Sequence, residues 1–82
     1  MSKLEKQIAR LLALPKDYTF NECASLLKNL GYEQYEGNGS RIKFIRNENE
    51  DKILLHRPHP KNEMKHYAIQ HVIEQLTSNG DI

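Results

Sequence analysis

The sequence is poor in several features that would otherwise narrow its class. Cys23 is the only cysteine in 82 residues, so no disulfide can form within the chain, and a lone cysteine is compatible with a reducing compartment. No apolar run approaches the ~18 residues that a membrane-spanning helix needs, and the first residues contain no apolar stretch of the secretory kind. We therefore expect a cytoplasmic protein with no membrane anchor, in which Cys23 is a core residue rather than a nucleophile.

What is present suits one globular domain over residues 1–82, with 38% hydrophobic and 28% charged residues. The net charge of +1 hides an asymmetry, because residues 37–66 carry seven Lys and Arg, four Asp and Glu, and three of the four histidines. Three of those acids, Glu48, Glu50 and Asp51, lie together, and the rest of the segment is strongly basic. A basic surface favours partners that carry phosphate. The same composition is also compatible with a charged face that is simply solvated and binds no partner.

Helical periodicity predicts two helices in the first third of the chain. Leucine and isoleucine recur at helical spacing through residues 3–14, and Pro15 ends that helix. Thr19 followed by Glu22 forms a capping box, which predicts the start of a second helix. That helix stops at Gly31, where a left-handed conformation suits a residue without a Cβ.

Three short strands are predicted next, at 32–36, 41–46 and 52–56. The first two are joined by a glycine-containing turn at 37–40, and the last two by a polar turn at 47–51. Such short turns favour antiparallel pairing.

After the strands, Pro58 and Pro60 predict an extended loop, followed by a helix at 64–76 and a flexible tail at 77–82. The expected fold class is α+β, in the order helix, helix, three-stranded antiparallel sheet, helix. One face of the sheet should pack against the helices, which leaves Arg41 and Lys43 on the other.

The segment 56–65 is the most unusual part of the chain. It contains His56 and His59 together with an arginine and two lysines. Imidazoles suit proton transfer near neutral pH, and cations hold phosphates and stabilise a more negative transition state. This combination is what metal-free RNA cleavage requires. The same residues are also compatible with a rigid loop whose histidines lie on the surface and have no catalytic role. No third ligand follows the two histidines at zinc spacing, so we expect neither a metal nor a cofactor.

Gly39, Ser40 and Arg41 form a second notable piece. Glycine lets a backbone approach a phosphate closely, and the serine and arginine can then bind it. A hairpin turn explains the glycines equally well.

Taken together, these motifs resemble the HicA family of bacterial toxins. The resemblance spans roughly residues 19–76 and rests on Thr19-Phe20-Asn21-Glu22, Leu26-Leu27, Leu30-Gly31-Tyr32, Gly39-Ser40, Pro58-His59-Pro60 and Lys65. It implies a fold like that of double-stranded-RNA-binding domains, an endoribonuclease activity on mRNA, and a HicB-like antitoxin as partner.

The chain departs from the family pattern at Arg41, where the resemblance implies a catalytic histidine. Three alternatives follow: proton transfer falls to His59 or, as second choice, to His56; Arg41 supports cleavage by electrostatics alone, at a lower rate; or the chain binds RNA or a protein without cutting. The residues expected to hold RNA are Gly39, Ser40, Arg41, Lys43, Arg57, Lys61 and Lys65. The helix within 1–14 lies outside the shortest family members, and it either covers an apolar face or pairs with another chain.

Overall fold

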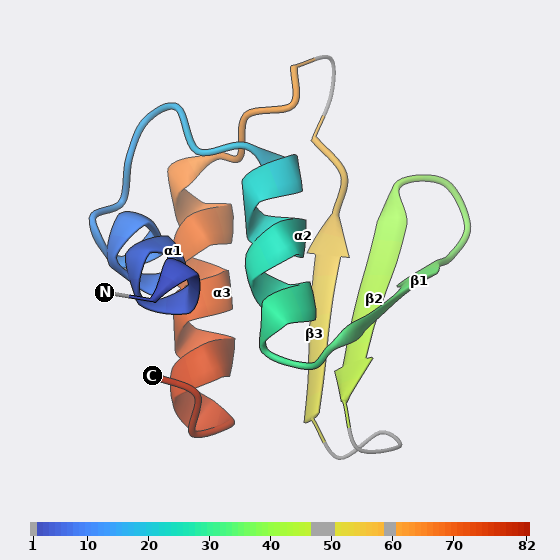
Figure 1. Cartoon of the computed structure of the whole chain (residues 1–82). Helices are drawn as coiled ribbons and strands as arrows, with labels where there is room; N and C mark the ends of the chain where they lie inside the picture. The colour runs from blue at the N-terminus through green and yellow to red at the C-terminus, as the bar shows by residue number, and fades with distance from the viewer. Residues whose placement is uncertain (1, 47–50, 59–60) are drawn as a thin grey trace.

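The helices and the sheet form two layers in the computed structural model (Figure 1), which describes residues 2–46, 51–58 and 61–82. The elements, in chain order, are α1 (Lys3–Leu12), α2 (Phe20–Asn29), β1 (Glu33–Glu36), β2 (Arg41–Arg46), β3 (Asp51–His56) and α3 (His66–Ser78). This order confirms the predicted α+β fold. The expected turn at 47–51 lies outside the described residues except for Asp51, and so do His59 and Pro60 of the expected loop.

Local capping sets where the first two helices begin. The Ser2 hydroxyl accepts from the backbone N–H of Glu5 at 3.1 Å and starts α1. The predicted capping box is present at the start of α2, where the Thr19 hydroxyl accepts from the Glu22 N–H and the Glu22 carboxylate accepts from the Thr19 N–H. Helix α1 ends at Leu12 rather than at Leu14.

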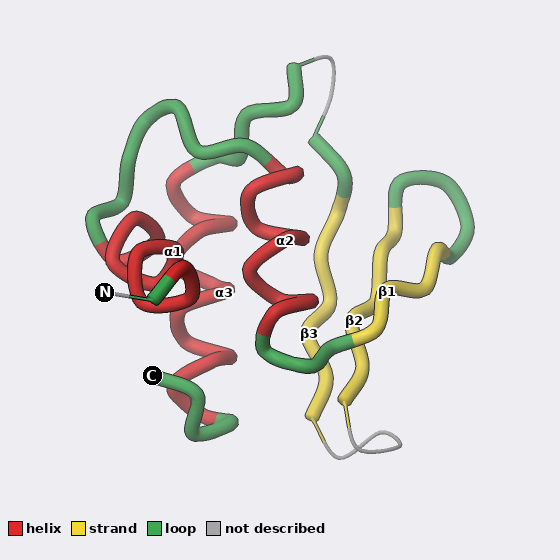
Figure 2. The backbone as a smooth tube through the Cα atoms, in the orientation of Figure 1, coloured by secondary structure: helices red, strands yellow, loops and turns green. Residues whose placement is uncertain are grey.

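The sheet is antiparallel, with β2 in the centre between β1 and β3. Alternate side chains of β2 and β3 point toward the helices and are buried: Ile42, Phe44, Ile53 and Leu55. The tube view separates the two layers clearly, with all three helices on one side of the sheet (Figure 2).

Helix α1 completes the core instead of standing apart from it. Leu11 is fully buried, and Leu4, Ile8 and Leu14 pack against the same apolar cluster. The first of the two expected roles for this helix, covering an apolar face, is therefore the one that the structure supports. Cys23 is also fully buried in the cluster, where burial raises the pKa of its thiol to about 12. The interpretation of Cys23 as a core residue is confirmed.

The last helix and the residues after it differ from the predicted bounds. The helix expected at 64–76 spans His66–Ser78, so it takes in the first two residues of the segment 77–82, which was expected to be a flexible tail. Beyond it, the Asp81 carboxylate accepts from the Tyr32 hydroxyl at 2.8 Å and from Arg46 at 2.6 Å, and Ile82 packs against the core. Side-chain contacts with distant residues thus hold a segment whose own sequence predicts no structure. Across the described residues, no helix has the length and apolarity to cross a membrane.

Candidate functional site

The face of the sheet turned away from the helices is the candidate site, and we call it the outward face. Strand alternation places there the side chains that do not enter the core. Three of those described are cations, Arg41, Lys43 and Lys52, and one is a histidine, His56. The exposed apolar groups of Tyr35 and Leu54 lie on the same face. Within the described residues, no element covers this face (Figures 1 and 2). The prediction that Arg41 and Lys43 lie exposed opposite the helices is confirmed.

Arg41 and His56 lie directly opposite one another on β2 and β3. The next pair toward the hairpin turn is Ser40 and Arg57, in which the Arg57 N–H donates to the Ser40 carbonyl at 2.8 Å. Because hydrogen-bonded and non-hydrogen-bonded pairs alternate in an antiparallel ladder, Arg41 and His56 form the non-hydrogen-bonded kind, in which side chains come closest. The guanidinium and the imidazole therefore project side by side from the outward face.

The hairpin turn between β1 and β2 borders this pair. The Gly37 N–H donates to the Arg41 carbonyl at 2.8 Å, and the Arg41 N–H donates to the Asn38 carbonyl at 3.3 Å. Gly39 has a φ of +65°, and a Cβ built there would meet nothing within 4 Å. The turn thus needs glycine for its backbone conformation, and the space beside it is open to a ligand.

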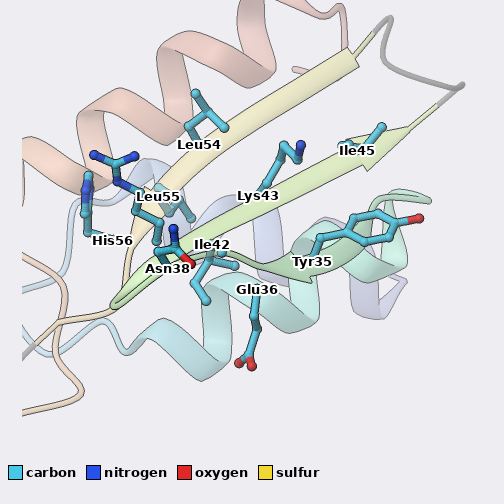
Figure 3. Close-up of a pocket in the computed structure, with 11 residues that line it drawn as sticks. Tyr35, Glu36, Asn38, Ile42, Lys43, Ile45, Leu54, Leu55 and His56 are labelled. Carbon is cyan, nitrogen blue, oxygen red and sulfur yellow. The ribbon is translucent and has the colours of Figure 1, made fainter.

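A hollow of about 660 Å³ lies over the outward face, and we call it the sheet hollow. Figure 3 shows its lining, with Lys43 and Leu54 on the side of the sheet opposite Glu36. Tyr35 and Lys43 are cross-strand neighbours in this lining, as are Lys43 and Leu54. The sheet hollow therefore combines cations, one imidazole and apolar surface, which is a chemistry suited to phosphates and bases together.

A second hollow of about 490 Å³ lies at the start of α3, and we call it the α3 hollow. Its basic lining comprises Lys16, Arg57, Lys61 and Lys65, and it also contains Tyr67. His56 lines both hollows and so lies where they meet. Arg41 of the segment 39–41 and described residues of 56–65 therefore line adjoining hollows.

Two arginines of the basic segment have partners within the domain. Arg57 forms an ion pair of 2.8 Å with Glu36, and its guanidinium lies 5.4 Å from the centre of the Phe20 ring. Arg46 forms ion pairs with Asp51 and Asp81 and lies over the Tyr32 ring. Arg46 is therefore a structural residue, and Arg57 is held partly by its own chain.

His59, the first choice for proton transfer in the sequence analysis, lies outside the described residues. Tyr35, Lys52 and Tyr67 also contribute to the exposed surfaces, although none of the three was predicted from the sequence as a site residue. Alternation along the strands identifies Tyr35 and Lys52. Tyr35 lies two residues from the exposed Glu33 in β1, and Lys52 lies two residues from the exposed Leu54 in β3, so each pair shares a face of the sheet. No sequence signal points to Lys16, which reaches the α3 hollow only through the tertiary fold. In the described part of the chain, no group of three or more His, Cys, Asp or Glu could hold a metal ion.

The structure defines a small α+β domain with an uncovered basic sheet face and a histidine at the end of its edge strand β3. Comparison with family models places the chain more specifically. The model described as the HicA toxin of bacterial toxin–antitoxin systems matches residues 20–77. This is well over half of the chain, so the chain belongs to the HicA toxin family, which implies an antitoxin partner of the HicB type. Comparisons with curated proteins and with solved structures gave no match.

Proposed function

We propose that this HicA-family protein binds RNA across its outward face and cleaves it there without a metal, with His56 transferring the proton. The observation that carries the proposal is the Arg41–His56 pair. Where the family resemblance implies a histidine after Gly-Ser, this chain has Arg41, but the residue opposite it on the neighbouring strand is an imidazole. In this chain the imidazole would therefore come from β3, and β2 would carry a guanidinium where the resemblance implies the imidazole.

Cleavage of RNA at such a site follows ordinary acid–base chemistry. His56 removes the proton of a ribose 2′-hydroxyl, and the resulting oxygen attacks the adjacent phosphorus. The bond from phosphorus to the 5′-oxygen breaks, that oxygen takes up a proton, and the products are a 2′,3′-cyclic phosphate and a 5′-hydroxyl. Arg41 and Lys43 stabilise the extra negative charge on the phosphate oxygens during attack. We assign the supply of this last proton to His59, which the sequence made the first choice for proton transfer.

Binding falls to the groups that surround this pair. Arg41 and Lys43 offer exposed cations on the outward face, and the adjoining turn at Gly39 and Ser40 has open space beside Gly39. Phosphate contacts of this kind give affinity that falls as salt rises. The apolar side chains of Tyr35 and Leu54 lie on either side of Lys43 on the neighbouring strands, so the surface also suits bases or a protein.

The outward face is also where we propose that the HicB-type antitoxin binds. Tyr35 is 48% exposed and Leu54 is 61% exposed, and both lie beside Lys43. A partner with acidic and apolar groups would complement this surface and exclude RNA from it. Addition of the antitoxin should therefore stop both RNA binding and cleavage.

The experiment compares the full chain with His56→Ala, His59→Ala and Arg41→Ala on a labelled single-stranded RNA. Binding is measured separately on a 2′-O-methyl version, which has no free 2′-hydroxyl and cannot be cut. We expect His56→Ala to reduce cleavage about 100-fold or more and leave binding within about twofold. The matched control is His71→Ala, an exposed histidine of α3 that lines neither hollow.

Three outcomes would contradict the proposal at different points. If His56→Ala cuts normally and His59→Ala does not, proton transfer depends on His59 alone. If the unchanged chain binds RNA but never cuts it, the protein is an RNA-binding module. If it binds no RNA at all, the outward face is a protein-interaction surface.

A further inference from the structure

The α3 hollow contains an aromatic ring that the fold leaves uncovered. Tyr67 is 71% exposed, the largest exposure of a bulky hydrophobic side chain in the described residues. It lies in the first turn of α3 and shares the hollow with Lys16, Lys61 and Lys65. An exposed tyrosine among cations offers a flat face for a base and charges for the phosphates beside it.

Lys16 reaches this hollow through a short pairing of distant segments. The Phe20 N–H donates to the Asn62 carbonyl at 2.8 Å, and the Met64 N–H donates to the Tyr18 carbonyl at 2.7 Å. These bonds join the entry to α2 with the entry to α3. Because Lys16 lies two positions before Tyr18, the pairing brings it beside α3. Lys16 lies outside the stretch that matches the family, so the N-terminal part of the chain contributes to the hollow.

The charge in the α3 hollow is strongly one-sided. Glu63 is its single acid, against Lys16, Lys61, Lys65 and Arg57, among the described residues. Within the same described part of the chain, no ion pair involves any of the three lysines, and all three are exposed. Their charges are therefore available to an external anion, whereas Arg57 is shared with Glu36.

We propose that the α3 hollow is a subsite for unpaired RNA, in which Tyr67 stacks on one base while Lys16, Lys61 and Lys65 hold the adjoining phosphates. This inference rests on the proposed function and extends it to the form of the substrate. A base within a duplex already stacks on its neighbours and cannot present its face to a side chain. A strand that leaves the α3 hollow past His56 enters the sheet hollow, where Tyr35 and Lys43 are exposed. The substrate is therefore single-stranded RNA that crosses both hollows.

The test measures binding of the full chain to a 2′-O-methyl single strand of about ten nucleotides and to the same strand in a duplex. Neither ligand can be cut through a 2′-hydroxyl, so the result does not depend on cleavage. Tyr67→Leu removes the ring, and Tyr67→Phe keeps it. We expect Tyr67→Leu to weaken single-strand binding about 5- to 150-fold, the range for loss of one stacked base, and Tyr67→Phe to bind almost normally.

Abasic oligonucleotides separate stacking from other effects of the substitution. They keep the phosphates but remove the bases, so the unchanged chain and Tyr67→Leu should bind them equally. Lys16→Ala should lower the salt dependence of single-strand binding by about 0.7 in the slope of log K against log salt. Lys28→Ala is the matched control, because Lys28 is an exposed lysine in the last turn of α2, outside both hollows.

Each alternative result has a distinct meaning. Equal binding by Tyr67→Leu and the unchanged chain, with loss of binding in Arg41→Ala, would overturn the subsite and leave the proposed function intact. Preference for the duplex over the single strand would overturn it as well. If the unchanged chain binds none of these oligonucleotides, the proposed function and the subsite are both refuted.

Discussion

The guanidinium of Arg46, at the end of β2, lies 2.6 Å from the carboxylate of Asp81, one residue from the end of the sequence. The same arginine donates to the Leu30 carbonyl at 3.1 Å and to Asp51 at 2.8 Å. One side chain thus ties the C-terminal residues, the end of α2 and the last pair of β2 and β3 together. The hydrogen bond to Asp81, together with the other hydrogen bonds and opposite charges, holds the pKa of Arg46 above its ordinary value. The Arg46 side chain therefore stays positively charged at neutral pH.

This network predicts that Asp81→Asn destabilises the protein although it changes a residue beside the terminus. Because the Asp81 side chain is only 9% exposed, we expect a loss of about 2 kcal/mol in the free energy of unfolding, typical of a lost hydrogen bond to a charged group. Urea denaturation measures it. The control is Asp17→Asn, since Asp17 is 74% exposed and pairs with an exposed arginine, so its change should be below about 0.5 kcal/mol. Equal effects of the two variants would refute the role of the network.

Tyr32 predicts a loss of stability at alkaline pH. Burial, together with the hydrogen bond to Asp81, raises the pKa of its hydroxyl to about 12, against about 10 in an unfolded chain. The folded state thus keeps a proton that the unfolded state loses. The contribution of Tyr32 is complete below pH 10 and disappears as pH rises toward 12.

We therefore expect Tyr32→Phe to flatten the decline in unfolding free energy between pH 10 and 12, by up to about 1.4 kcal/mol per pH unit. Some decline should remain, because burial also raises the pKa of Cys23 and Tyr18. Urea midpoints across this pH range provide the measurement, and Tyr67→Phe, at an exposed position, should follow the unchanged protein. A decline as steep in Tyr32→Phe as in the original chain would show that another group causes it.

The two adjacent leucines of α1 give a direct test of its role in the core. Leu11 is fully buried and Leu12 is 50% exposed, and the two residues lie in the same helical turn. We expect Leu11→Ala to lower the free energy of unfolding by about 2–5 kcal/mol and Leu12→Ala by less than about 1 kcal/mol. Thermal or urea unfolding distinguishes them. A small effect at Leu11 would mean that α1 is an appendage to a core that folds without it.

Much of this fold follows from local signals in the sequence. The capping box at Thr19 and Glu22 starts α2 where it was predicted, and the alternation of buried and exposed residues in 41–46 gives the bounds of β2 as the structure has them. These signals succeed because hydrogen bonding within four residues and burial of alternate side chains are both set by adjacent residues. The exposed basic face follows from the same alternation.

The remaining features depend on contacts between distant residues. Nothing near Asp81 indicates that Arg46 lies 35 positions away in the chain and only 2.6 Å away in space. Lys16 enters the α3 hollow only through the pairing of 18–20 with 62–64. The sequence contains His56 and Arg41, but their direct opposition requires the register of β2 and β3. Local reasoning therefore yields candidates, and tertiary structure determines which of them meet.

The Arg41–His56 register also predicts that the imidazole can be moved between strands. In a His56→Ala background we expect cleavage to be lost, and the further change Arg41→His should restore part of it. The restored imidazole would project from β2 into the position beside the one vacated on β3, because the two residues are direct partners on the outward face. Initial rates of RNA cleavage across pH 5–9 measure the rescue, which should show the pH dependence of a histidine base.

The control for this rescue introduces a histidine elsewhere on the outward face, away from the Arg41–His56 pair. Glu33→His in the His56→Ala background also adds an exposed imidazole to the outward face, at the opposite end of the sheet from residue 41. It should restore no cleavage, because residue 33 lies at the far end of the sheet from the Arg41–His56 pair. Rescue by both variants would mean that a histidine anywhere on the face suffices. Rescue by neither would mean that an imidazole at position 41 of β2 cannot replace the one at position 56 of β3, which would contradict the proposed exchange of groups between the two strands.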